Sequence, residues 1–161
     1  MKEFYCANSE ETEKLGFAIG QTAGEGDVIC LSGDLGAGKT HFVKGLALGL
    51  GIDADVTSPT FTLLNNYPKS TPSEPLIRQL NHFDVYRVND EDEILDLGFE
   101  EMIYGEDISV IEWSSLIAGI LPENSLTINI QHGNSPQERI ITMNWSQSML
   151  KRSLPNVDTC R

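Results

Sequence analysis

Residues 33–40 read GDLGAGKT and match the pattern G-x-x-x-x-G-K-[ST] of a phosphate-binding loop. Glycines at these positions let the backbone curl so that successive N–H groups point at phosphate oxygens. The ammonium of Lys39 can reach the β- and γ-phosphates, and the hydroxyl of Thr40 can bind Mg²⁺. The spacing therefore predicts binding of a nucleoside triphosphate. The residues expected to contact it are Gly33, Asp34, Leu35, Gly36, Ala37, Gly38, Lys39, Thr40 and His41.

The elements predicted on either side of this loop are those that phosphate binding requires. Asp27 to Leu31 (DVICL) is an apolar run that predicts a buried strand, and a helix is expected from Lys39 to about Leu50. The positive end of that helix adds to the attraction for an anion. A glycine-rich turn that only joins a strand to a helix is the ordinary alternative. A dinucleotide-binding loop is excluded because the spacing is not G-x-G-x-x-G and Lys39 would be unexplained.

A phosphate-binding loop works with a second acid that holds magnesium at the end of a buried strand. Glu112 follows the apolar residues of the predicted strand Ile108 to Trp113 (ISVIEW), and Asp84 ends the less apolar stretch LNHFD. A surface acid at the edge of a strand is the alternative for both. The hydroxyl of Thr40 is one expected metal ligand. Of the two acids, we prefer Glu112 as the second ligand and place Asp84 after it.

Two further stretches carry hydroxyl, acid and base groups. Ser58-Pro59-Thr60-Phe61 lies about twenty residues beyond the loop, where nucleotide-sensing switch segments often lie, and an ordinary loop is the alternative. In HFDVYR (82–87), strand alternation places His82, Asp84 and Tyr86 on one face, either as a reactive cluster or as a hydrogen-bonded network beside the core. Arg87 could stabilise γ-phosphate charge, but an ion pair with an acid is the more common role. The residues expected to serve catalysis are Lys39, Thr60, Asp84 and Glu112.

The remaining pattern predicts an α/β fold in which antiparallel strands are added to a parallel core, as one domain over residues 1–161. A first helix is capped by Asn8 or Ser9, and another helix is capped by Asn89. A loop at Pro68 to Pro75 joins two antiparallel strands, Phe61 to Asn66 and Leu76 to Tyr86. Ser125 to Ile130 and Glu138 to Trp145 form a hairpin, and residues from about 147 to 161 form a short helix and a tail.

Composition limits the classes of function. Eleven basic and 24 acidic residues give a net charge of −13, so the surface repels phosphate backbones and unaided binding of DNA or RNA is not expected. No apolar run reaches the length of a membrane span. The three cysteines lack the spacing of a disulfide framework or a zinc site, which indicates a reducing compartment, and we expect the cytoplasm.

The four stretches GDLGAGKT, SPTF, HFDVYR and IEW, in this order and spacing, resemble the TsaE (YjeE) family. The resemblance runs over roughly residues 8 to 145. It implies a P-loop NTPase fold with a mixed parallel and antiparallel sheet flanked by helices. It also implies an ATPase of tRNA threonylcarbamoyladenosine biosynthesis that binds ATP and Mg²⁺. Its partners would be the TsaD and TsaB proteins, which modify the adenosine beside the anticodon, so this chain would meet tRNA only indirectly through them.

The resemblance also implies roles for single residues. Thr40 and Glu112 would hold Mg²⁺, Asp84 would belong to the active site, and Ser58 to Phe61 would act as a switch. Residues near the first helix lie beside the adenine in that family, which suggests Ser9 and Thr12 here. The chain departs from the family at His41, at Ser114-Ser115 after the Glu-Trp pair, and in the insert from Pro68 to Pro75, which could alter a partner surface.

Other functions remain open from the sequence. A small-molecule kinase usually gathers arginines around its acceptor, and only Arg78 and Arg87 lie between the loop and the hairpin. A GTPase is disfavoured because no NKxD-type signature is present. A nucleotide-gated adaptor could bind ATP and partners without turnover. If the chain is an ATPase, its hydrolysis alone should be slow, because no general base or arginine finger is evident.

Overall fold

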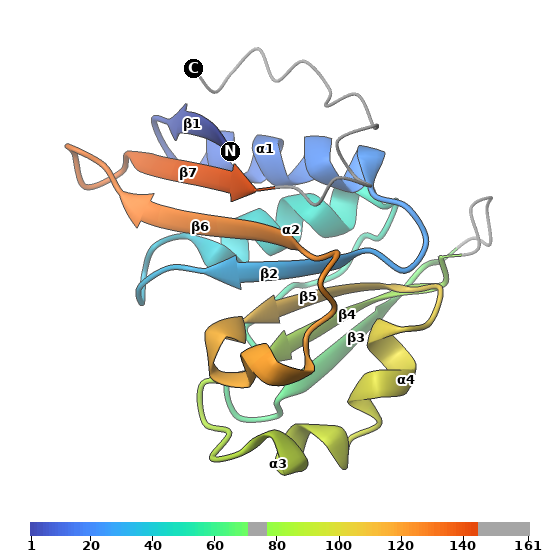
Figure 1. Ribbon diagram of the computed structural model, residues 1–161. Helices are drawn as coiled ribbons and strands as arrows, with labels where there is room; N and C mark the ends of the chain where they lie inside the picture. The colour runs from blue at the N-terminus through green and yellow to red at the C-terminus, as the bar shows by residue number, and fades with distance from the viewer. Residues whose placement is uncertain (71–76, 145–161) are drawn as a thin grey trace.

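The computed structural model describes residues 1–70 and 77–144, and its centre is a seven-stranded mixed sheet with the order β1-β7-β6-β2-β5-β4-β3 (Figure 1). The strands are β1 (Lys2–Cys6), β2 (Val28–Ser32), β3 (Leu64–Pro68), β4 (Gln79–Asp84), β5 (Ile108–Glu112), β6 (Leu126–His132) and β7 (Arg139–Asn144).

The four inner strands run parallel. β2 pairs with β5 and β6, and β4 pairs with β5, all in parallel, whereas β1, β3 and β7 join by antiparallel pairing. This confirms the expected combination of a parallel core with antiparallel additions. Because parallel strands end at the same edge, the segments that follow β2, β4 and β5 meet there.

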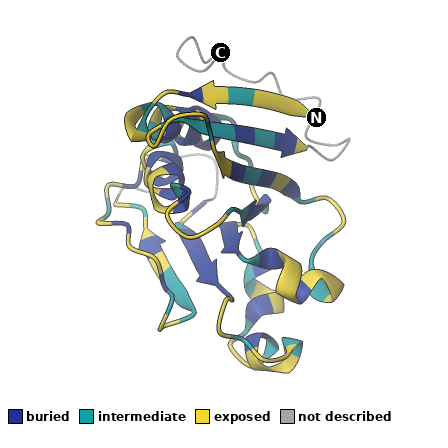
Figure 2. Ribbon diagram, turned by 90° about the vertical axis from the view of Figure 1, so that its left-hand side faces the viewer, coloured by how far each residue is buried: buried dark blue, intermediate teal, exposed yellow. Residues whose placement is uncertain are grey.

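Side chains alternate across the sheet and give the molecule two cores. On β2, Ile29 and Leu31 join the larger core while Val28 and Cys30 join the smaller one. Helices α1 (Ser9–Thr22) and α2 (Lys39–Gly49) cover the first face. The short helices α3 (Glu91–Leu95), α4 (Phe99–Ile103) and the 3₁₀ segment η1 (Ser114–Ile120) cover the second. Figure 2 shows the buried inner strands between these layers.

Helices α1 and α2 pack at unusually close range. A Cβ placed on Gly45 would lie 1.9 Å from the carbonyl oxygen of Glu13, and one on Gly49 would lie 2.2 Å from that of Phe17. Gly16 and Gly20 make the reciprocal approach from α1. Residues further along α1 contact residues further along α2. The two helices therefore run in the same direction, with their N-termini at the same end.

Several predicted boundaries are wrong. Asn8 caps α1 as expected, its side chain accepting from the N–H of Glu11 at 2.9 Å. The predicted cap Asn89 is displaced by Asp90, which accepts from the N–H of Glu93. The segment that Asn89 was expected to cap forms two short helices, because Gly98 takes a left-handed conformation with φ +77°.

Strand boundaries differ as well. The strand expected at Phe61 to Asn66 begins only at Leu64, after a turn, and Trp113 lies outside β5 with φ +61°. Strand β1 and the segment η1 were not predicted. Pro72, Pro75, Leu76 and the expected C-terminal helix lie outside the described residues. Across residues 1–70 and 77–144, none of the helices has the length and apolar character needed to cross a lipid bilayer.

We expect Gly45→Ala to lower the free energy of unfolding by about 1–3 kcal/mol, because the added methyl must push α1 away from α2. The higher helix propensity of alanine offsets only up to about 1 kcal/mol of this cost. Chemical denaturation measures the change. Leu48→Ala, at a partly exposed position of the same helix, is the control. Equal stability of Gly45→Ala and wild type would contradict the close contact.

Candidate functional site

The loop of residues 33–40 leaves the end of β2 and enters α2, as its sequence predicts. Two glycines show why the loop needs this residue type. Gly33 has φ +148°, and a Cβ there would lie 2.5 Å from the carbonyl oxygen of Ile130 on the neighbouring β6. Gly38 has φ +101° and is the N-cap of α2. These conformations cost other residues energy, so the loop shape depends on glycine.

Lys39 lies within this loop with its side chain buried. Its ammonium donates to the carbonyl oxygens of Gly33, at 2.5 Å, and Asp34, at 3.0 Å. It also lies 4.9 Å from the centre of the Trp113 ring. Burial lowers the pKa of Lys39, and the nearby charges of Glu112, Asp84 and Asp34 oppose that shift. The loop therefore presents a cation close to two acids.

Asp84 and Glu112 lie opposite each other at the ends of β4 and β5, and both are almost fully buried. Asp84 accepts hydrogen bonds from Ser58 Oγ (2.9 Å), Thr60 Oγ1 (3.2 Å) and the N–H of Tyr86 (3.1 Å). Glu112 Oε1 lies 3.2 Å from Nε2 of His82. Buried carboxylates require such partners.

The loop, the two acids and the switch hydroxyls line one cavity of about 490 Å³. The structure thus brings together most of the residues that the sequence singled out for chemistry. The lining comprises Leu35, Gly36, Ala37, Gly38, Lys39, Thr40, His41, Ser58, Thr60, Asp84, Tyr86, Arg87, Glu112 and Trp113.

Two residues of the expected switch segment do not line this cavity. Pro59 is buried, whereas Phe61 is exposed and packs against Arg87, whose guanidinium carbon lies 4.5 Å from the ring centre. The sequence favoured an ion pair for Arg87, and the structure gives it this aromatic contact instead. The side chain of Arg87 still reaches the edge of the cavity.

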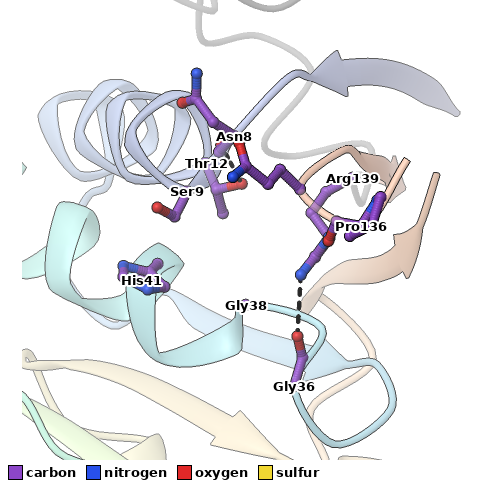
Figure 3. A pocket seen from close by; sticks show the side chains of 9 residues that line it. Asn8, Ser9, Thr12, Gly36, Gly38, His41, Pro136 and Arg139 are labelled. Atoms are coloured by element: carbon purple, nitrogen blue, oxygen red, sulfur yellow. Dashed lines mark hydrogen bonds between the residues drawn. The ribbon is translucent and has the colours of Figure 1, made fainter. Parts of the chain in front are cut away.

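A second cavity, of about 310 Å³, lies on the other side of the loop between α1 and the β6–β7 turn (Figure 3). It shares Gly36, Gly38 and His41 with the first cavity, so the two adjoin along the loop. Ser9 and Thr12, the two residues that the resemblance suggested for contact with an adenine, are among its lining residues. Its other lining residues are Asn8, Pro136, Gln137 and Arg139.

Arg139 is a site residue that the sequence gave no reason to select. Its guanidinium donates to the carbonyl oxygens of Ala37, at 2.7 Å, and Gly36, at 3.2 Å, and to those of Pro136 and Glu138, at 2.8 Å each. Figure 3 shows the contact with Gly36. These bonds hold the carbonyls of Gly36 and Ala37 toward the hairpin and so fix the course of the loop. The contact spans 102 residues of sequence, so no local motif could indicate it.

The donor set fits a magnesium ion shared with phosphate oxygens. Mg²⁺ prefers oxygen ligands and is usually held by one or two carboxylates together with phosphates and water. Glu112, Asp84 and the hydroxyl of Thr40 supply such ligands around the same cavity. Within residues 1–70 and 77–144 there is no group of three or more His, Cys, Asp or Glu that could hold a metal by itself.

Comparison with known proteins identifies the family. The family model described as "Threonylcarbamoyl adenosine biosynthesis protein TsaE" matches residues 6–141. This chain belongs to the TsaE family. The TsaE protein of Treponema pallidum is 44% identical over 124 residues, which cover 77% of this chain and 87% of that protein. The TsaE protein of Bacillus subtilis is 42% identical over 133 residues, covering 83% and 79%. Both are named tRNA threonylcarbamoyladenosine biosynthesis proteins.

A solved member supports the fold. The crystal structure of Bacillus subtilis YdiB matches with a TM-score of 0.72 and 34% identity, covering 96% of this chain and 86% of that one. The fold is thus the α/β P-loop architecture with a mixed sheet that the resemblance to the TsaE family implied.

We expect Arg139→Gln to weaken binding of ATP measured without Mg²⁺ by about 10- to 150-fold, because hydrogen bonds from a charged group contribute about 1.5–3 kcal/mol and here they order the loop. Isothermal titration calorimetry measures the change. Arg78→Gln, which removes an exposed arginine far from the loop, is the matched control. Affinity within twofold of wild type would show that Arg139 does not support the loop.

Proposed function

We propose that this TsaE-family chain is an ATP-binding, Mg²⁺-dependent ATPase that supports tRNA threonylcarbamoyladenosine formation by TsaD and TsaB type proteins. The observation that carries the proposal is the meeting of Lys39, Asp84 and Glu112 at one cavity beside the phosphate-binding loop. Family membership supports the connection with tRNA threonylcarbamoyladenosine biosynthesis.

The chain's own residues account for binding and orientation of the triphosphate. Loop N–H groups and Lys39 would contact the phosphates, while Thr40, Glu112 and Asp84 would hold Mg²⁺. Bound Mg²⁺ would neutralise charge on the phosphate oxygens. Ser58 and Thr60 already donate to Asp84, so the switch segment is in contact with this acid.

The second cavity is the proposed site of the adenine. At about 310 Å³ it lies at the lower end of the range for ligand pockets. The hydroxyl of Thr12 donates to the carbonyl of Asn8, and its methyl group lies toward Gly38. Thr12 would therefore offer an apolar contact to the base, and the exposed Ser9 would offer a hydroxyl.

Turnover by the chain alone is expected to be slow. His82, the base nearest to the acids, contacts Glu112 and Tyr67. Arg87 contacts Phe61, and Arg139 donates to backbone carbonyls. No described side chain of the cavity is thus poised as a general base or as an arginine finger toward a γ-phosphate. Fast hydrolysis by the purified protein would contradict this expectation.

A partner would then complete catalysis, and hydrolysis would reset the assembly between rounds of modification. The net charge of −13 fits a protein that leaves tRNA to its partners. We place this activity in the cytoplasm.

The proposal is tested by tRNA threonylcarbamoyladenosine formation with TsaD, TsaB, threonylcarbamoyl-adenylate and ATP, in the presence and absence of this chain. We expect multiple rounds of product with wild type. Lys39→Ala should lower the multiple-turnover rate about 30-fold or more, because a charge-assisted contact contributes about 2–3 kcal/mol. Product formation that needs neither the chain nor Lys39 would overturn the proposal and favour a metabolite kinase.

Replacing the acids separates an ATPase from a nucleotide-gated adaptor. Glu112→Gln and Asp84→Asn keep the size of each side chain but remove its charge, so we expect hydrolysis to fall about 100-fold or more while ATP binds without Mg²⁺ within about fivefold of wild type. Calorimetry and phosphate release measure the two quantities. Full support of tRNA modification by a variant that binds but cannot hydrolyse ATP would establish the adaptor.

A further inference from the structure

A buried polar network contacts the carboxylate of Glu112. The ring of His82 is fully buried on β4, with Nε2 at 3.2 Å from Glu112 Oε1 and Nδ1 at 3.4 Å from the hydroxyl of Tyr67. Tyr67, on β3, donates that hydroxyl to the carbonyl of Thr57 at 3.0 Å and accepts from the N–H of the same residue at 3.3 Å. The network therefore runs from the proposed metal acid to the residue that precedes Ser58.

This network occupies positions where apolar side chains would serve the core at lower cost. On β4, Leu80 and Phe83 are buried and apolar whereas Asn81 is buried and polar, and a buried imidazole must keep both nitrogens satisfied to be tolerated. The side chain of Asn65 adds a donor to the Tyr67 hydroxyl at 3.3 Å. Among the described residues, no buried side-chain nitrogen or oxygen lacks a partner. The arrangement joins strands β3, β4 and β5.

The same segment reaches the other acid by a direct route. Ser58 and Thr60 both donate to Oδ2 of Asp84, and the two hydroxyls lie 3.0 Å from each other. Asp84 and Glu112 are paired across β4 and β5. Residues 57–60 are thus connected to Asp84 directly, through Ser58 and Thr60, and to Glu112 indirectly, through Tyr67 and His82.

We propose that His82 and Tyr67 are positioning residues that couple the orientation of the Glu112 carboxylate to the conformation of residues 57–61. The inference rests on the proposed function, since it assigns these residues to the same nucleotide site. A tyrosine hydroxyl has one proton, so it cannot donate to Thr57 and to His82 at the same time. Movement of residue 57 consequently changes the bonding of His82 and, through it, the support of Glu112.

The variant Tyr67→Phe tests the coupling because it removes one oxygen and keeps the ring. Hydrogen–deuterium exchange of peptides within residues 58–66 is measured with a non-hydrolysable ATP analogue, in Mg²⁺ and in EDTA. We expect Mg²⁺ to lower deuterium uptake in wild type, and Tyr67→Phe to show less than about half of that decrease. Affinity for the analogue in EDTA should stay within about twofold, and kcat should fall about fivefold or more with KM for ATP nearly unchanged.

The matched control is Ser109→Ala. Ser109 is fully buried on β5 and accepts a hydrogen bond from Asn81 at 3.3 Å, so its replacement also disturbs a polar contact between β4 and β5. It lies outside the network of His82. We expect this variant to keep the Mg²⁺-dependent decrease in uptake and the wild-type kcat, whereas a general loss of stability would affect both variants.

His82→Gln provides a second measurement that does not depend on Tyr67→Phe folding well. A glutamine amide can reach the position of Nε2 and still donate to Glu112, but it has no group at the position of Nδ1. We expect it to lose the Mg²⁺-dependent decrease in uptake as Tyr67→Phe does. A decrease of wild-type size in either folded variant, with unchanged kcat, would overturn the inference.

The outcomes also separate this inference from the proposed function. Wild-type protein that fails to bind the ATP analogue would overturn both. Wild type that binds and hydrolyses ATP, together with variants that behave like wild type, would overturn the coupling alone.

Discussion

The parallel pairing of β4 with β5 is the constraint on which the site depends, because it forces two buried carboxylates, Asp84 and Glu112, to end side by side. Two such charges repel each other in a poorly solvated environment, and each requires compensation. Lys39 supplies a positive charge, the hydroxyls of residues 58 and 60 bond to the first acid, and His82 contacts the second. Much of the polar structure around the sheet edge can be understood as the response to this one pairing.

Two kinds of contact, one local and one from a distant strand, fix the shape of the loop of residues 33–40. Backbone conformations that suit glycine shape it locally, and Arg139 from β7 holds two of its carbonyls from across the sheet. The pairing of β1, β7 and β6 thus contributes to the site, because it positions Arg139 beside the loop. The antiparallel β6–β7 hairpin therefore contributes Arg139 to the lining of the cavity beside the loop, in addition to extending the sheet.

Local patterns predicted the parts of this structure that depend on neighbouring residues. The strand, loop and helix around Lys39 follow from apolar runs and glycine spacing, and both acids were selected because each comes at the end of an apolar stretch within a predicted strand. Contacts between distant segments were not predictable. Arg139 reaches Ala37 across 102 residues, and β1 is a strand only because β7 is available to pair with it. Arg87 was assigned an acid partner because the position of the Phe61 ring cannot be inferred from one sequence. The break at Gly98 depended on one backbone conformation within an otherwise helical pattern.

The close contact between α1 and α2 has a mechanical consequence. Helices whose backbones touch at four glycines cannot slide or rotate against each other without collision, so α1 and α2 form one stiff body. The cavity beside Ser9 and Thr12 lies on this body, whereas residues 57–61 and Arg87 lie on loops across the sheet edge. The wall of that cavity formed by α1 is therefore held rigid by helix packing, whereas residues 57–61 are held by side-chain contacts with Asp84, Tyr67 and Arg87.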